Sequence, residues 1–303
     1  MNHSKIAVIA TVSSLLTFAL AQPGPAAYPA DLKPTHADLA YASTSKAQTL
    51  DLFVPQGNGP FPLVVNIHGG GFMAGSKEML DAPIARALLK EGVAVASINY
   101  RLSGEARFPA AVLDAKAAVR FLRANAARYR LNPDRFLAFG QSAGGNLASL
   151  LGTSGGVAAF EDPALGNAGT SSRVQGVIDW FGPTDFLQMD AAAKAQGCPA
   201  DHGQANSPES KYLGKPIAEV PELVRQANPI TYIDSGDPPF LLQKGDKDCL
   251  IPFAQSQLLH DALRKAGVAA ALETLAGAGH GGAQFSTEAN VRRVVEFVKA
   301  TLK

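Results

Sequence analysis

The stretch AFGQSAGGNLASLL (residues 138–151) decides the fold prediction. It places Ser142 between closely spaced glycines, after an apolar run of strand length and before a helix-like pattern. A lone G-x-S-x-G motif is weak evidence, because it arises readily by chance. A strand–turn–helix context makes the motif specific, because it forces the serine into an exposed, strained conformation where a helix begins. We interpret Ser142 as a nucleophile, against the alternative of an ordinary serine in a glycine-rich turn.

Strand-like and helix-like segments alternate along the chain. The expected strands cover residues 62–68, 93–100, 135–140, 174–182 and 239–245, and a further strand-like run covers residues 270–276. The expected helices cover residues 77–91, 109–129, 142–151, 254–267 and 287–302. This alternation predicts one α/β domain over residues 49–303, with a mostly parallel sheet and helices on both faces. Residues 185–230 are expected to form an irregular insertion over the carboxyl edge of the sheet, where sites form in such folds.

A serine nucleophile needs a base within hydrogen-bond reach. The glycine-flanked loop AGAGHGGAQF (residues 276–285) follows the last strand-like run and offers His280, which we expect to be that base. A glycine-flanked loop suits a base that must move slightly between nucleophile and leaving group. Another histidine, His202, lies in the insertion and could border a pocket, but its surroundings favour a surface loop.

The base in turn needs a carboxylate that fixes its tautomer. The segment GDKDCLIP (residues 245–252) offers Asp246 and Asp248. We favour Asp248, because it lies deeper in the loop and directly precedes Cys249. Asp246 is interpreted as a turn residue, although the reverse assignment stays open. The chain order Ser142, Asp248, His280 is the order expected of an α/β-hydrolase.

An oxyanion site is predicted in NIHGGGF (residues 66–72). The backbone amides of Gly70, Gly71 and Ala143 are expected to converge on a developing negative charge. A phosphate cradle is the alternative, but no G-K-[ST] follows the glycines. The aromatic residues Phe72, Trp180 and Phe181 are candidates for the substrate pocket wall, although aromatics at such places are more often core residues.

The N-terminal residues MNHSKIAVIATVSSLLTFALA (1–21) match a secretory signal peptide that is cleaved after Ala21. A membrane anchor is the alternative, but the uncharged stretch is short for a span. Residues 22–48 are interpreted as an N-terminal lead-in, mobile at its start. An even cysteine count in an exported chain favours a disulfide between Cys198 and Cys249, against two separately buried thiols.

Composition excludes several other functions. The 303 residues carry a net charge of +1 with no basic run, so a nucleic-acid surface is not expected. No H-E-x-x-H or H-x-x-E-H string is present, and no metal or cofactor is expected. We expect no stable membrane insertion after removal of the signal peptide, and the sequence does not determine the oligomeric state.

Several segments resemble a known family. HGGGF, INYRLS, GQSAGG and PPFLLQKGDKDCLIP are similar to bacterial carbohydrate esterases of the α/β-hydrolase superfamily, which include feruloyl and acetyl-xylan esterases. The hormone-sensitive-lipase-like esterases are more distant. The resemblance implies a Ser142–His280–Asp248 triad and oxyanion donors at Gly70, Gly71 and Ala143. One departure is Lys244, at a position where this branch commonly has histidine.

The resemblance implies a secreted serine esterase that acts through an acyl-enzyme. Its expected substrates are short-chain or aryl esters, such as feruloyl and acetyl esters of plant polysaccharides. A polyester-degrading or general lipase-like carboxylesterase is an alternative. A non-catalytic binding protein with the same fold is a remote alternative, because such proteins normally lack a triad residue or an oxyanion glycine.

Overall fold

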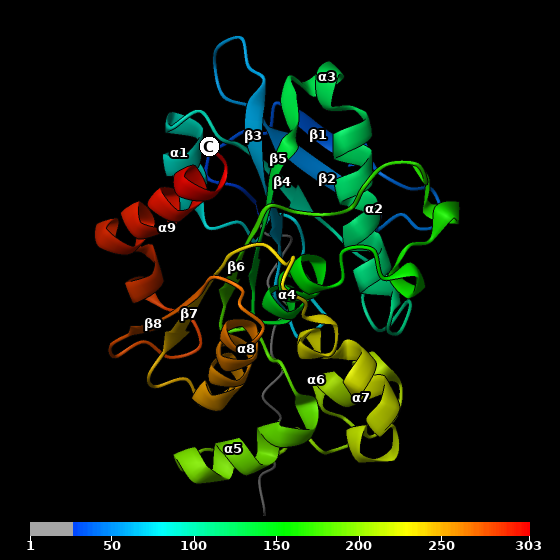
Figure 1. Ribbon diagram of the computed structural model, residues 1–303, viewed down its shortest axis with the longest axis vertical. Coiled ribbons are helices and arrows are strands. Elements are labelled where there is room, and N and C mark those ends of the chain that lie inside the picture. The colour runs from blue at the N-terminus through cyan, green and yellow to red at the C-terminus, as the bar shows by residue number, and fades with distance from the viewer. Residues whose placement is uncertain (1–26) are drawn as a thin grey trace, which may run out of the picture.

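The computed structural model describes residues 27–303, and within this range eight strands form one sheet (Figure 1). The strand order is β1-β2-β4-β3-β5-β6-β7-β8. The six strands from β4 to β8 in this order are parallel, whereas β1 and β2 run antiparallel at one edge. The strands are β1 (His36–Ala40), β2 (Thr49–Phe53), β3 (Phe61–Ile67), β4 (Ala94–Ile98), β5 (Leu131–Gln141), β6 (Gly176–Trp180), β7 (Phe240–Gly245) and β8 (Ala270–Leu275). The predicted α/β class is confirmed.

Helices cover both faces of the sheet (Figure 1). Alternate residues of β3 separate two cores: Leu63 and Val65 pack with α2, α4 and α8, whereas Val64 packs with α1 and α9. No helix of residues 27–303 has the length and apolarity to cross a membrane. The helices are α1 (Ala82–Lys90), α2 (Ala110–Ala124), α3 (Ala126–Tyr129), α4 (Ala143–Thr153), α5 (Met189–Gln196), α6 (Pro208–Leu213), α7 (Pro221–Ala227), α8 (Phe253–Lys265) and α9 (Glu288–Thr301).

The segment predicted as a lead-in contributes to the sheet. Strand β1 lies inside residues 22–48 and pairs antiparallel with β2, with Leu39 opposite Leu50. Upstream of it, the Tyr28 hydroxyl donates a hydrogen bond to Asp51 (3.1 Å). The interpretation of this segment as only a lead-in is therefore wrong for its described part, because β2 offers an open edge that β1 covers. The predicted signal peptide, residues 1–21, lies outside the described residues.

The insertion at residues 185–230 is more regular than expected. It folds into α5, α6 and α7, which gather at one end of the sheet below α4 and α8 (Figure 1). Buried Met189, Tyr212 and Val224 give it an apolar interior. A disulfide between Cys198 and Cys249 joins the insertion to the loop after β7, with the two Cα atoms 5.3 Å apart. This bond excludes the alternative of two free thiols.

Candidate active site

The turn between β5 and α4 holds Ser142 in a strained backbone conformation. Its φ of 55° and ψ of −123° lie in a region that non-glycine residues rarely adopt. The Ser142 amide donates to the carbonyl of Trp180 at 2.9 Å, which fixes the turn against β6. A Cβ atom at Gly144 would lie 2.0 Å from the carbonyl oxygen of Ile67, so only glycine allows the helix to pass this close to β3. The sequence motif therefore has the strand–turn–helix geometry that was predicted from it.

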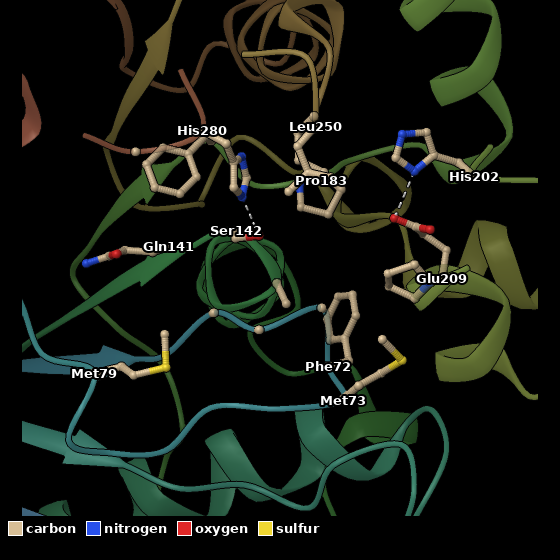
Figure 2. Close-up of a pocket in the computed structure, with 18 of the residues that line it drawn as sticks. Phe72, Met73, Met79, Gln141, Ser142, Pro183, His202, Glu209, Leu250 and His280 are labelled. Carbon is tan, nitrogen blue, oxygen red and sulfur yellow. Dashed lines mark hydrogen bonds and ion pairs between the residues drawn. The ribbon is translucent and has the colours of Figure 1, made fainter. Parts of the chain in front are cut away.

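Ser142, His280 and Asp248 form a continuous hydrogen-bonded chain. The Ser142 Oγ lies 2.9 Å from Nε2 of His280, and Nδ1 of His280 lies 2.9 Å from Oδ2 of Asp248 (Figure 2). The three side chains come from the turn after β5, the loop after β8 and the loop after β7. With the Nδ1 proton held by Asp248, Nε2 of His280 is free to accept the hydroxyl proton of Ser142.

The carboxylate of Asp248 is buried and held from several directions. Its Oδ1 accepts hydrogen bonds from the amides of Leu250 (2.9 Å) and Ile251 (3.0 Å). Burial alone would raise the pKa of Asp248, but the hydrogen bond from His280 and the charge of Lys244 outweigh it and lower that pKa to about 2. Asp248 is therefore ionised at neutral pH.

Lys244 lies next to Asp248, and its role was not interpreted from the sequence. It is fully buried at the end of β7, and its Nζ lies 2.5 Å from Oδ2 of Asp248, the same oxygen that His280 contacts. It also donates to the carbonyl of Ile251. The i,i+4 spacing of Lys244 and Asp248 around a turn was the available signal, but spacing alone does not show that both side chains point inward.

The competing acid, Asp246, has a different role. It is exposed, and its Oδ1 accepts a hydrogen bond from the amide of Gly277 at 2.7 Å, which joins the loop after β7 to the loop that carries His280. The structure therefore brings Asp248 to His280 and leaves Asp246 as a turn residue.

The glycine loop after β3 lies against the turn that holds Ser142. A Cβ atom at Gly69 would be 3.3 Å from Cβ of Ser142. Gly70 has φ of +107°, which turns the loop back on itself and favours glycine. Within residues 27–303, the amides of Gly70, Gly71 and Ala143 donate no hydrogen bond to another loop or side chain. They are therefore available to an oxygen that binds beside Ser142.

A cavity of about 550 Å³ opens above Ser142 and His280. Phe72 and Phe181 line it, as predicted, together with the apolar side chains of Met73, Met79 and Leu250 (Figure 2). Trp180 does not line it, so the prediction for this residue is wrong. Its side chain lies on the face of the sheet that α1 and α9 cover, where it packs against Phe139 and Phe285.

His202 also lines this cavity, so the alternative that it borders a pocket holds over the favoured surface position. It is 4% exposed, and its Nδ1 lies 3.3 Å from Oε1 of Glu209, which is 3% exposed. The sequence around it is polar, and most of this loop is indeed exposed, but the side chain of His202 turns inward to Glu209 of α6. Across residues 27–303, no group of three or more His, Cys, Asp or Glu side chains could hold a metal ion.

Comparisons with known proteins give a family match and several named relatives. The family model BD-FAE matches residues 50–263. Esterase LipQ of Mycobacterium tuberculosis is 30% identical over 77% of this chain, and Esterase LipC of the same organism is 29% identical over 73%. The chain spans about half the length of these curated relatives, 53% in both cases.

Two solved structures are also similar to this chain. A truncated carbohydrate esterase from gut microbiota is 33% identical, with a TM-score of 0.81 over 91% of this chain and 99% of that chain. A bifunctional GH43-CE protein of Bacteroides eggerthii is 35% identical, with a TM-score of 0.81 over 88% of this chain and 35% of that chain. The resemblance to carbohydrate esterases is confirmed: the chain belongs to the BD-FAE family and has the α/β-hydrolase fold.

Proposed function

We propose that this protein is a serine carboxylesterase, with Ser142 as nucleophile, His280 as general base and acid, and Asp248 as the residue that orients His280. The hydrogen-bonded chain of these three side chains carries the proposal. Named esterases among the relatives support the reaction class.

The reaction follows from the positions of these atoms. Ser142 Oγ attacks the ester carbonyl carbon while its proton passes to Nε2 of His280. The carbonyl oxygen becomes an oxyanion, which the amides of Gly70, Gly71 and Ala143 stabilise. Collapse of this intermediate expels the alcohol, which takes the proton from His280. A water molecule then attacks the acyl-serine with His280 again as base, and the acid and free Ser142 result.

We propose short-chain acyl or aryl esters as the substrates, such as acetyl and feruloyl esters of plant polysaccharides. The cavity of about 550 Å³ with apolar walls suits an acetyl or a single aryl group, and the solved carbohydrate esterase supports this class. We also propose export through the signal peptide at residues 1–21. The Cys198–Cys249 disulfide supports this, since such bonds persist in oxidising compartments.

Replacement of the nucleophile tests the proposal. Ser142→Ala should lower kcat/KM for p-nitrophenyl acetate by about 10⁴-fold or more, with an unchanged circular dichroism spectrum. Ser235→Ala, in an exposed loop, is the matched control and should keep full activity. A fluorophosphonate should label wild type at Ser142, as read by peptide mass spectrometry. Turnover by Ser142→Ala, or labelling at another serine, would reject the assignment. Methyl ferulate and acetylated xylan then distinguish the substrate classes.

A further inference from the structure

The cavity above Ser142 has a second polar group besides the proposed catalytic residues. In Figure 2, Ser142 and His280 lie on one side, whereas the hydrogen-bonded pair of His202 and Glu209 lies on the other. Both His202 and Glu209 belong to the cavity lining, and the side chains drawn between the two groups are apolar, with Pro183 among them. A charged group in such a wall needs an explanation, because burial of a carboxylate is unfavourable unless it is paired.

The hydrogen bonds of Glu209 are incomplete. Its Oε1 contacts Nδ1 of His202 at 3.3 Å, which is a long hydrogen bond. Its other carboxylate oxygen, Oε2, is buried and has no hydrogen-bond partner among residues 27–303. A carboxylate accepts several hydrogen bonds, so Glu209, which lines the cavity, has unused acceptor capacity.

His202 and Glu209 are held in place by contacts that leave their side-chain polar atoms free for other partners. Tyr212, three residues after Glu209 in α6, stacks on Phe72 of the glycine loop with ring centroids 3.8 Å apart. The carboxylate of Asp190 accepts hydrogen bonds from the amides of His202 (2.8 Å) and Gly203 (2.9 Å). The insertion is therefore fixed against the glycine loop after β3, and Glu209 has a defined position relative to Ser142.

The charges around His202 favour its cationic form. Burial alone would lower the pKa of His202, but its hydrogen bond to Glu209 and the charges of Glu209, Asp190 and Asp201 outweigh this effect and raise it. A cationic imidazole is a donor at both ring nitrogens, so Nδ1 of His202 donates to Oε1 of Glu209. A carboxylate accepts hydrogen bonds, so the group that completes those of Glu209 is a donor.

We propose that Glu209, positioned by His202, accepts a hydrogen bond from a hydroxyl group of the ester substrate and thereby selects hydroxylated esters. This inference rests on the proposed esterase function. The hydroxyl is either a phenol on an aryl acyl group or a sugar hydroxyl beside the ester. A substrate without that hydroxyl leaves the remaining acceptor capacity of the buried carboxylate unused, and sites of this kind discriminate strongly against such analogues.

Matched ester pairs test the inference. Methyl ferulate and methyl 3,4-dimethoxycinnamate differ by one capped phenol. A monoacetylated methyl xyloside and its counterpart with methylated remaining hydroxyls differ in their sugar hydroxyls. For each pair, the measured quantity is the ratio of kcat/KM for the hydroxylated ester to that for the capped ester. Wild type should favour the hydroxylated ester about tenfold or more in at least one pair, and that pair identifies the source of the hydroxyl.

Variants of Glu209 show whether it carries the preference. Glu209→Leu should reduce the ratio about tenfold, towards one, because neither ester then meets a buried carboxylate. Glu209→Gln, which keeps the size and one acceptor oxygen, should give an intermediate ratio and serves if the leucine variant is unstable. Glu219→Leu is the control, because it removes an exposed carboxylate from the same insertion but outside the cavity lining, and it should keep the wild-type ratio.

The ratio separates specificity from structural damage, because both esters of a pair are measured on the same protein. An equal loss on both esters would assign Glu209 a structural role and overturn the inference. A wild-type ratio near one in both pairs, with ester hydrolysis intact, would overturn it as well and leave the esterase proposal standing. Absence of hydrolysis and of fluorophosphonate labelling at Ser142 would overturn both.

Discussion

Lys244→Met removes the buried cation beside Asp248 and keeps most of the side-chain volume. In the native protein, Nζ lies 2.5 Å from Oδ2 of Asp248, and both side chains are completely buried. Removal of one partner from such a pair costs about 3–5 kcal/mol of folding free energy, because the other charge stays buried without compensation. Since His280 and two backbone amides still bond Asp248, we expect a loss near the lower limit, about 3 kcal/mol.

Urea unfolding at pH 7 measures this loss, and Lys247→Met is the matched control. Lys247 is exposed and neighbours Asp248 in sequence, so its removal should change stability by less than about 0.5 kcal/mol. A double-mutant cycle with Asp248→Asn isolates the pair. If Lys244→Met lost no more stability than Lys247→Met, the buried ion pair would not exist as described.

The loss should depend on pH with a defined sign. The pKa of Asp248 is lowered from 3.8 to about 2 in the folded protein. Its contribution to stability is therefore fully present above about pH 4 and is lost as the pH falls towards 2. The stability difference between wild type and Lys244→Met should shrink between pH 7 and pH 3. A difference that stayed constant over this range would contradict the assignment of Lys244 as the charge partner of Asp248.

Two further predictions concern the same loop. Asp248→Asn should lower kcat by about 10⁴-fold, because His280 loses its orienting carboxylate, whereas Asp246→Asn should stay within about tenfold of wild type. Steady-state kinetics on p-nitrophenyl acetate compare the two variants. The opposite ranking would exchange the roles of the two aspartates. Replacement of both Cys198 and Cys249 by serine should lower the free energy of unfolding by about 4 kcal/mol, since the bond closes a loop with a sequence separation of 51 residues. A loss below about 1 kcal/mol in urea unfolding would show that this crosslink does not constrain the unfolded chain.

Local sequence patterns predicted the elements that rest on local chemistry. The run VVNIH predicted β3, and the glycines around Ser142 predicted the turn, because a close backbone approach excludes any Cβ there. Strand β1 was missed, because HADLA is short and has no buried residue, and only its pairing with β2 makes it a strand. Trp180 was placed in the cavity because it ends a strand beside the site, but the alternation of side chains along β6 turns it to the other face.

The sequence by itself determined the fold class, the serine turn and the order of Ser142, Asp248 and His280, because each depends on short-range patterns or on motifs with a fixed geometry. Only the tertiary structure decided that Asp248 rather than Asp246 meets His280, that Lys244 shares an oxygen with it, and that Glu209 lies buried at the cavity. The physical reason is that burial and pairing of charges depend on which distant segments pack together. Residues 32 positions apart in the chain, such as Asp248 and His280, come within hydrogen-bond distance only after the sheet has aligned the strands that carry their loops.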